Sequence, residues 1–213
     1  MDDEEARWDA RYREADPAAA RPADVLTAHA HLLPVRGEAL DLACGLGANA
    51  RLLAGRGLRA HAWDRSPEAI DRLSALARSQ GLCVEARVRD VVAEPPPAGA
   101  FDVIVVAHFL ERSLFPALIA ALRPGGLLFY QTWTREAVTG RGPANPAYRL
   151  EPGELLRAFA GLRVLAYREE GCVGDATSGM RDQAWLVAMK PAAPEREAPE
   201  SEAPESEAPE SER

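Results

Sequence analysis

The sequence predicts an α/β fold in which a mostly parallel sheet carries helices on both faces. Between residues 38 and 133, short apolar runs alternate with amphipathic segments, which is the pattern of βαβ units. A glycine-rich stretch follows the first apolar run, at residues 41–50. Two further apolar runs near the C-terminus are joined by the glycine-containing segment 170–182, which predicts a closing hairpin. We therefore expect an open α/β sheet that ends in an antiparallel strand.

Each element has its own signal. The apolar runs predict strands at residues 38–43, 58–63, 83–88, 101–107, 127–133, 162–169 and 183–190. The segments between them predict helices at residues 48–55, 67–80, 112–122 and about 152–160. Ser66, Pro67 and Glu68 form a helix start, because they supply an N-cap, a proline at the first helical position and an early acid. Residues 123–126, Arg-Pro-Gly-Gly, predict a helix stop and a turn into the next strand.

Length and composition fit one globular domain. The chain has 213 residues, of which 47% are hydrophobic and 27% charged. Its three cysteines, Cys44, Cys83 and Cys172, show no zinc-type spacing, so we expect reduced thiols and a cytoplasmic protein. No run of about 18 apolar residues occurs, and the acidic N-terminus has no signal-peptide pattern. We therefore expect neither secretion nor a membrane partner.

The net charge of −8 is concentrated at the chain ends. Residues 191–213 hold eight glutamates and two arginines and repeat the sequence EAPES three times. A segment without aromatic or β-branched residues has little to bury, so we expect a disordered tail, either a solubilising extension or a docking tail for a protein partner. Residues 1–190 carry a charge of only −2, which argues against a nucleic-acid partner.

The stretch that carries most chemical information is residues 41–50, Asp-Leu-Ala-Cys-Gly-Leu-Gly-Ala-Asn-Ala. Glycines let the backbone turn sharply beside a ligand, and the following helix presents free N–H groups. The pattern G-x-G-x-x-A alone is shared with dinucleotide-binding proteins, and it also suits a plain strand-to-helix turn. Two acidic residues make the pattern more specific, because Asp41 precedes the glycines and Asp64 ends the next strand.

Five segments in order resemble the class I S-adenosylmethionine-dependent methyltransferases, and among them the small tellurite-resistance (TehB-like) branch. They are LDLACGLGANARLLAGRG, AWDRSPEAI, Arg-Asp-Val at 89–91, FDVIVVAHFLER and LRPGGLLFYQTW. The resemblance covers nearly all of residues 1–190. It implies a Rossmann-like, seven-stranded sheet with strand order 3-2-1-4-5-7-6. It also implies S-adenosylmethionine as cofactor, no metal, and a small-molecule methyl acceptor such as a thiol, a soft anion or a metalloid oxyanion.

The resemblance also implies roles for single residues. Asp41 would meet the cofactor's methionine amino group, Asp64 both ribose hydroxyls, and Asp90 the adenine amino group beside the Val91 backbone. The remaining implied cofactor-binding residues are Ala43, Gly45, Gly47, Asn49, Arg65 and Ala107. A structural alternative for Asp90 is a turn or helix cap.

Expectations for the acceptor side are sparser. Trp8 and Tyr12 share one face of an N-terminal helix, in a helical lid region over residues 1–34, where they could shelter a sulfonium or simply pack. Trp133, Arg141 and Asn145 lie at and after the end of the fifth strand, where an ordinary surface loop is the alternative. His108 is the candidate catalytic residue, either as a base or as a polar contact.

Several classes are disfavoured. Residues 107–110, Ala-His-Phe-Leu, lack the Asn/Asp-Pro-Pro-aromatic motif of methyltransferases that act on base amines, and they lack the Pro-Cys nucleophile of the cytosine C5 enzymes. The carboxylates that metal-dependent catechol enzymes need after the fourth and fifth strands are also missing. A dehydrogenase would not need an acid at Asp41. A non-catalytic S-adenosylmethionine-binding module that recruits a partner through its tail remains the alternative to an enzyme.

Overall fold

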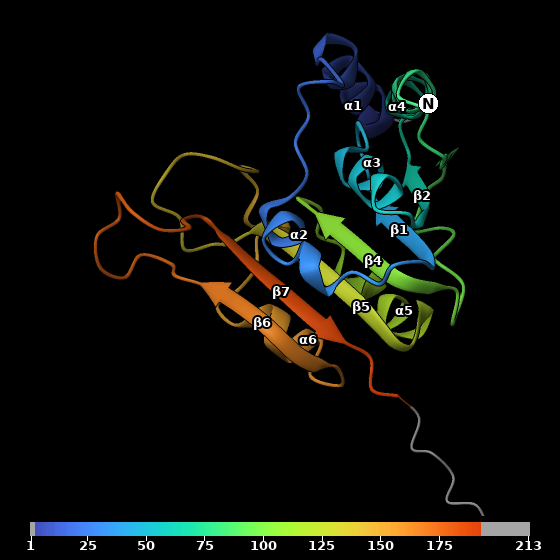
Figure 1. Ribbon diagram of the computed structural model, residues 1–213. Coiled ribbons are helices and arrows are strands. Elements are labelled where there is room, and N and C mark those ends of the chain that lie inside the picture. Colours follow the sequence, from blue (N-terminus) through green and yellow to red (C-terminus); the bar gives the residue numbers. More distant parts are fainter. Residues whose placement is uncertain (1–2, 193–213) are drawn as a thin grey trace, which may run out of the picture.

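A computed structural model describes residues 3–192, and the predicted tail lies outside the described residues except for its first two positions. A seven-stranded sheet has the order β3-β2-β1-β4-β5-β7-β6, as the family resemblance implies (Figure 1). The strands are β1 (Glu38–Leu42), β2 (Arg59–Asp64), β3 (Val84–Val88), β4 (Phe101–Ala107), β5 (Leu122–Trp133), β6 (Arg163–Glu169) and β7 (Gln183–Met189). Strands β1 to β5 pair in parallel, whereas β7 is antiparallel to both β5 and β6.

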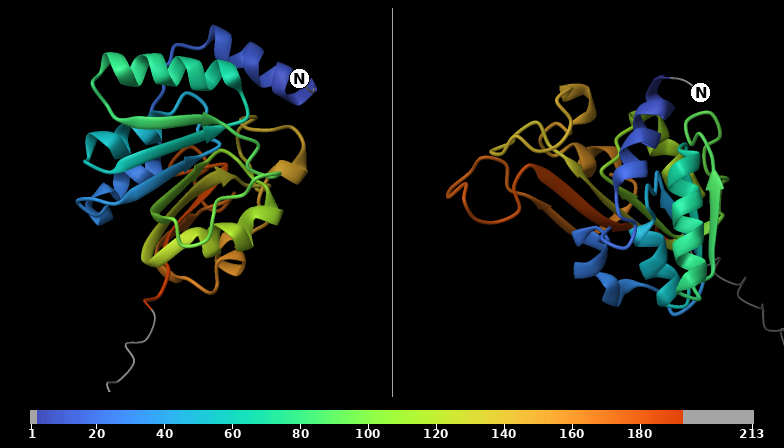
Figure 2. Two further views of the ribbon diagram at one scale, coloured as in Figure 1. Left: turned by 90° about the vertical axis from the view of Figure 1, so that its right-hand side faces the viewer. Right: turned by 90° about the horizontal axis from the view of Figure 1, so that it is seen from above.

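Helices cover both faces of this sheet (Figures 1 and 2). The α-helices are α1 (Asp3–Glu14), α2 (Asp24–Ala28), α3 (Ala48–Gly55), α4 (Pro67–Ser79), α5 (Phe115–Ala121) and α6 (Glu154–Ala158). Three 3₁₀ turns lie at Ala30–Leu32, Arg112–Leu114 and Pro146–Tyr148. Helices α2, α3 and α4 lie on one face and α5 and α6 on the other, while α1 packs outside α4.

The core explains why the central strands are almost wholly apolar. In β4, Val103 and Val105 pack into the cluster under α2, α3 and α4, whereas Ile104 and Val106 pack into the cluster under α5 and α6. All four side chains are 0% exposed. A parallel strand that is buried on both faces needs apolar residues at every position, so it reads as a continuous run.

Three predicted boundaries needed correction. The predicted helix 112–122 is a 3₁₀ turn followed by the shorter helix α5, because Pro116 sits where a helix begins. Strand β5 begins at Leu122 rather than at residue 127, since Leu122 pairs with Phe101 before the register shifts. Helix α6 spans only Glu154–Ala158, since it follows Gly153 in a left-handed conformation (φ 67°). The other predicted boundaries agree within about one residue.

No helix within residues 3–192 is both long and apolar enough to cross a membrane. The same residues contain no group of three or more His, Cys, Asp or Glu side chains that could hold a metal ion.

Candidate cofactor and acceptor site

The candidate site lies at the carboxyl ends of β1 and β4, where the strand order reverses direction. Open α/β sheets bind ligands in this crevice. The loop after β1 turns on Gly45 (φ 51°) and Gly47 (φ 67°), and a Cβ at Gly47 would lie 2.4 Å from a Leu73 methyl carbon. Ala43 (φ 55°) and His108 (φ 56°), directly after β1 and β4, also adopt positive φ, which is uncommon outside glycine. Such strain on both sides of a crevice is typical of functional sites.

Asp64 ends β2 with its carboxylate beside the glycine loop. The backbone N–H of Gly45 donates to its Oδ2 at 2.7 Å, and that of Ser66 donates to its Oδ1 at 2.9 Å. The side chain is only 6% exposed, and burial raises the pKa of Asp64 against these hydrogen bonds. A carboxylate has about four acceptor positions, so Asp64 keeps capacity for a further donor such as a vicinal diol.

Asp41, the predicted partner of the cofactor's amino group, is almost fully buried and already accepts hydrogen bonds from the protein. It is 1% exposed, and its oxygens accept from the Asn49 Nδ2 amide at 3.1 Å and from the Ala50 N–H at 3.0 Å. Burial raises the pKa of Asp41 to about 7. Asn49 also accepts from the Ala23 N–H at 2.8 Å, so the two residues tie the start of α3 to the segment before α2. A contact between Asp41 and a cofactor amino group stays a prediction.

The remaining predicted cofactor residues line the same edge. Asp90 is exposed, and its Oδ1 accepts from the Val92 and Ala93 N–H groups, so it caps a turn and leaves its second oxygen open. Val91 is buried, whereas Arg65 and Ala107 are half-buried at the ends of β2 and β4. The turn-capping role that the sequence left open for Asp90 is thus present, and its adenine contact stays a prediction.

Helix α1 covers the glycine loop. Trp8 and Tyr12 stack with ring centroids 5.7 Å apart, and a Cβ at Gly45 would lie 2.9 Å from the Tyr12 hydroxyl oxygen. Burial, followed by the nearby Asp64 charge, raises the Tyr12 pKa. Asp9 accepts from the Ser66 hydroxyl, which holds α1 against the start of α4. The packing role that the sequence left open for Trp8 and Tyr12 is thus present, and their contact with an acceptor stays a prediction.

His108 lies on the acceptor side with an aromatic neighbour. Its ring centroid is 5.4 Å from that of Trp133. The backbone N–H of His108 donates to the backbone carbonyl oxygen of Gln131 at 2.8 Å. Partial desolvation lowers the pKa of His108, although the residue is exposed at the mouth of the site. Gln183 and Asp24 raise this pKa, whereas Arg141 and Arg11 lower it further. The shift favours the neutral form of the imidazole.

Two glutamines that the sequence reasoning missed complete this side. Gln131 is 2% exposed, and its Oε1 accepts from the Val25 N–H at 2.8 Å. Its Nε2 donates to Gln183 Oε1 at 2.6 Å, and Gln183 lies directly opposite Trp133 on the neighbouring strand. No motif marks these residues, because their proximity depends on the antiparallel register of β5 and β7.

The loop at residues 134–150 is tied down at both ends. Asp182, 2% exposed, accepts from the N–H groups of Val138 (2.6 Å) and Thr139 (3.1 Å) and from the Thr139 hydroxyl. Arg141 lies over the Trp133 ring, 5.7 Å from its centroid. Asn145 instead accepts from the Ala147 N–H at 2.9 Å and starts the 3₁₀ turn, and no contact with His108 or Trp133 is found in the described part of the chain. A role for Asn145 in acceptor binding stays a prediction.

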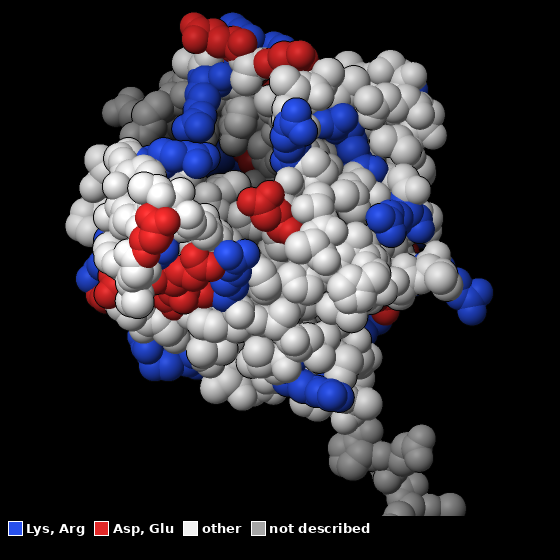
Figure 3. Space-filling view, turned by 60° about the vertical axis from the view of Figure 1, so that its left-hand side comes forward, with Lys and Arg blue, Asp and Glu red and all other residues white. Residues whose placement is uncertain are grey.

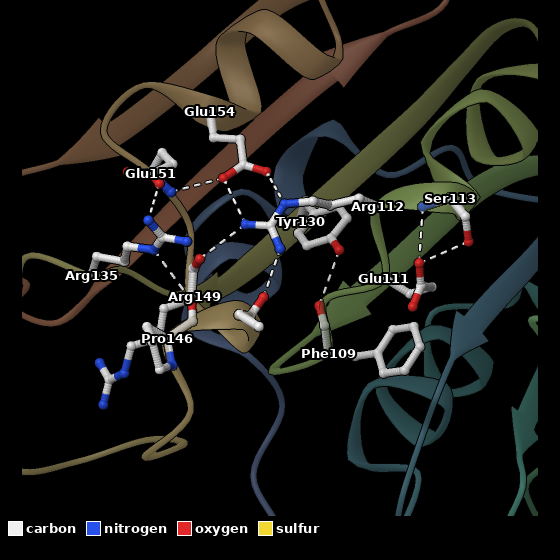
Figure 4. Close-up of polar contacts among 11 residues, drawn as sticks. Phe109, Glu111, Arg112, Ser113, Tyr130, Arg135, Pro146, Arg149, Glu151 and Glu154 are labelled. Atoms are coloured by element: carbon white, nitrogen blue, oxygen red, sulfur yellow. Dashed lines mark hydrogen bonds and ion pairs between the residues drawn. The ribbon is translucent and has the colours of Figure 1, made fainter.

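Arg112 anchors the far end of this loop (Figure 4). Its guanidinium donates to both carboxylate oxygens of Glu154, at 2.7 and 3.0 Å, and to the carbonyl oxygens of Ala147 (2.6 Å) and Arg149 (3.0 Å). Burial raises the pKa of Glu154, but Arg112 outweighs it, so the pKa lies below its usual range. Figure 3 is turned so that the side of the molecule with the loop 134–150 comes forward. On this side, basic side chains lie around a hollow in the surface.

Fold and site together define a class I S-adenosylmethionine-dependent methyltransferase fold. Within it, the family "Methyltransferase domain" matches residues 39–126, so the chain carries a methyltransferase domain there. These matched residues run from β1 to the Pro-Gly-Gly turn in β5 and include Asp41, Asp64, Asp90 and His108.

Individual proteins of similar sequence or structure support this assignment. A ubiquinone biosynthesis O-methyltransferase of Methylocella silvestris is 33% identical over an alignment of 160 positions that covers 66% of this chain. The chain spans 62% of the length of that relative. The solved structure of TehB from Haemophilus influenzae superposes with a TM-score of 0.65 at 20% identity, covering 81% of this chain and 63% of TehB. The [4+2]-cyclase SpnF superposes with a TM-score of 0.64 at 21% identity, covering 84% of this chain and 86% of SpnF. Since one of these proteins is called a cyclase, the fold alone does not determine the reaction.

Proposed function

We propose that this chain transfers the methyl group of S-adenosylmethionine to a small-molecule acceptor. The observation that carries the proposal is the pairing of Asp64 with the glycine loop. A buried carboxylate at the end of β2 is held 2.7 Å from the Gly45 N–H, and both border the crevice beside His108. We further propose a cytoplasmic location and no nucleic-acid or membrane partner, supported by the low net charge of residues 1–190.

The residues present suit this cofactor. Asp64 retains acceptor positions for two hydroxyl groups, and the glycines allow a ligand to approach the backbone closely. Tyr12 packs against this loop at Gly45. When bound, S-adenosylmethionine supplies a methyl group on a positively charged sulfur, which can pass to a nucleophile in one displacement. Such a transfer depends on positioning and desolvation, so the chain needs no catalytic dyad for an acceptor that is already ionised.

The acceptor is proposed to be small because the loop at the mouth of the site, residues 134–150, is anchored by Asp182 and Arg112. Trp133 offers an aromatic face beside His108, and Arg141 and Arg11 supply positive charge there. These groups suit a planar or anionic molecule. The name of the relative points to an oxygen acceptor, whereas the tellurite-type resemblance points to a soft anion or thiol. A neutral imidazole favours oxygen, because a hydroxyl must lose a proton during transfer.

Binding of the cofactor tests the proposal first. Asp64→Asn keeps the shape of the side chain but removes its charge. We expect the affinity for S-adenosylmethionine to fall by roughly 1.5–3 kcal/mol, about 10- to 100-fold, the range for hydrogen bonds to a charged group. Titration calorimetry measures the change, and Asp71→Asn on the exposed side of α4 is the matched control.

Turnover is the second part of the test. Purified protein with S-adenosylmethionine is offered 3,4-dihydroxybenzoate, thiophenolate and tellurite, and mass spectrometry detects methylated product and S-adenosylhomocysteine. Tight binding without S-adenosylhomocysteine formation from any acceptor would support the non-catalytic module instead. A wild-type preference for NAD, or equal cofactor affinity in the two variants, would reject the cofactor site.

A further inference from the structure

The loop at residues 134–150 contains three arginines, and the guanidinium groups of two of them bind other groups of the same loop. Arg135 is ion-paired with Glu151. Arg149 donates to three backbone carbonyl oxygens of the loop. Within residues 3–192, the guanidinium group of Arg141 has no hydrogen-bond acceptor and no carboxylate partner, and its one contact is with an aromatic ring. The charge of Arg141 is therefore available to a ligand.

The backbone of Arg141 is fixed although the residue is exposed. Its N–H donates to the Thr139 hydroxyl oxygen at 3.2 Å, and its carbonyl oxygen accepts from an Arg149 guanidinium nitrogen at 2.5 Å. The Thr139 hydroxyl in turn donates to the carboxylate of Asp182, which is buried directly before β7. Because these bonds already order the backbone, a ligand that binds the guanidinium pays little for ordering the loop.

This fixed arginine lies on the acceptor side of the site. Its guanidinium carbon is 5.7 Å from the centroid of the Trp133 ring, which is 5.4 Å from the centroid of the His108 ring. The next residue, Gly142 (φ 90°), packs so closely on Trp133 that a Cβ there would lie 2.6 Å from the ring atom Cδ2. One cation and two flat rings, from the loop, the end of β5 and the end of β4, are therefore held together at the mouth of the site.

The charges around His108 favour a negatively charged ligand at this place. Desolvation lowers the pKa of His108, and the positive charges of Arg141 and Arg11 lower it further, whereas Asp24 raises it. On this side of the molecule, basic side chains lie around a hollow in the surface (Figure 3). A hollow lined by one sign of charge attracts ligands of the opposite sign.

We propose that Arg141 binds a carboxylate group of the methyl acceptor while the acceptor's flat ring lies against Trp133, and that Thr139 positions Arg141 for this contact. The inference rests on the proposed methyl transfer and narrows its acceptor to aromatic acids. A guanidinium presents parallel N–H groups that match the two oxygens of a carboxylate. One guanidinium also balances the single charge of a carboxylate, whereas a phosphate group carries about −1.5 to −2 at pH 7.

Two probes that share a ring and differ in charge test the contact by titration calorimetry. They are 3,4-dihydroxybenzoate and its methyl ester. We expect the wild type to bind the acid about 10- to 100-fold more tightly than the ester, the range for hydrogen bonds to a charged group. Arg141→Met should lose this preference, and Arg141→Lys should keep part of it, because an ammonium group retains the charge without the planar fork.

The control and the contrary outcomes are equally specific. Arg78→Met, at the exposed end of α4, should keep the wild-type preference. Added salt should weaken binding of the acid more than binding of the ester, because salt screens exposed charge pairs. Equal affinities of the wild type for acid and ester, or the same preference in Arg141→Met, would overturn the proposal. Phenyl phosphate binding more tightly than benzoate would overturn the choice of a carboxylate.

Thr139 is tested by a pair of variants. Thr139→Val keeps the shape of the side chain but removes the hydroxyl that joins Asp182 to the Arg141 N–H, whereas Thr139→Ser retains that hydroxyl. We expect the preference for the acid to fall several-fold in Thr139→Val and to stay at the wild-type value in Thr139→Ser. The affinities for the ester and for S-adenosylmethionine should be equal in both variants. Equal preferences for the acid in the two variants would reject Thr139 as a positioning residue.

Turnover separates this inference from the proposed function. S-adenosylhomocysteine formation is measured with each probe, and Arg141→Met should raise the KM for the acid about tenfold or more. A wild type and an Arg141→Met variant that methylate acid and ester equally well would reject the role of Arg141 and leave methyl transfer intact. A wild type that binds the acid through Arg141 but forms no S-adenosylhomocysteine would support the carboxylate site and count against the proposed transfer.

Discussion

At the scale of single residues, two buried or crowded groups give the stability opposite dependences on pH. Burial raises the pKa of Asp41 from 3.8 to about 7, so the folded chain keeps a proton that the unfolded chain has lost between these values. The free energy of unfolding therefore falls as the pH rises through this window. The pKa of His108 is lowered, so its contribution is complete above pH 6.5 and is lost as the pH falls below that value.

Asp41→Asn isolates the first of these effects. The amide cannot titrate, so the fall in unfolding free energy between pH 4 and 7 should become shallower than in the wild type. The amide nitrogen also faces the donor Asn49 Nδ2, so we expect lower stability overall, but the slope is the informative quantity. Urea unfolding at several pH values measures it, with Asp71→Asn as control. Parallel slopes in wild type and Asp41→Asn would show that Asp41 is ionised in the folded chain.

At the scale of elements, the sequence predicted the parts that local pattern determines. The strands, the helix start at Ser66 and the glycine loop follow from periodicity, capping and positive φ, and Asp64 follows from its place at a strand end. Asp182, Gln183 and Arg112 could not be predicted in this way. Their roles depend on the register of β7 against β5 and on the path of the loop 134–150, and neither leaves a local pattern.

Arg112 supports a prediction about that loop. Arg112→Met removes its bonds to Glu154, Ala147 and Arg149, so the loop should open more often. We expect faster hydrogen exchange over residues 140–150 and a KM for the acceptor raised several-fold, with unchanged affinity for S-adenosylmethionine. Arg78→Met, on the exposed end of α4, is the matched control. Exchange rates equal to those of the control would contradict an anchoring role for Arg112.

At the scale of the whole molecule, the strained non-glycine residues lie at one end of the sheet, and Lys190 fixes the end of the last strand at the other. Among residues 3–192, the non-glycine residues with positive φ are Ala43, His108 and Asp182, and all three lie at the edge of the candidate site. Each costs about 1–2 kcal/mol relative to a relaxed backbone. At the opposite edge, Lys190 donates through Nζ to the carbonyl oxygens of Ile119, Ala120 and Leu122. These hydrogen bonds pair carbonyl oxygens at the C-terminal end of α5 and hold the end of β7 against that helix.

The contrast between Lys190 and the segment after it gives a prediction about where the folded domain ends. Lys190→Met leaves three carbonyl oxygens without this donor, so we expect a loss of about 1–2 kcal/mol and roughly 2–8 °C in Tm. A chain that ends at Ala192 keeps Lys190, and the removed residues, 193–213, offer no aromatic or β-branched side chain to bury. Its Tm and its affinity for S-adenosylmethionine should therefore match those of the full chain in calorimetry. If the shortened chain lost as much stability as Lys190→Met, the acidic segment would have to contact the domain, and its glutamates would be the first side chains to test.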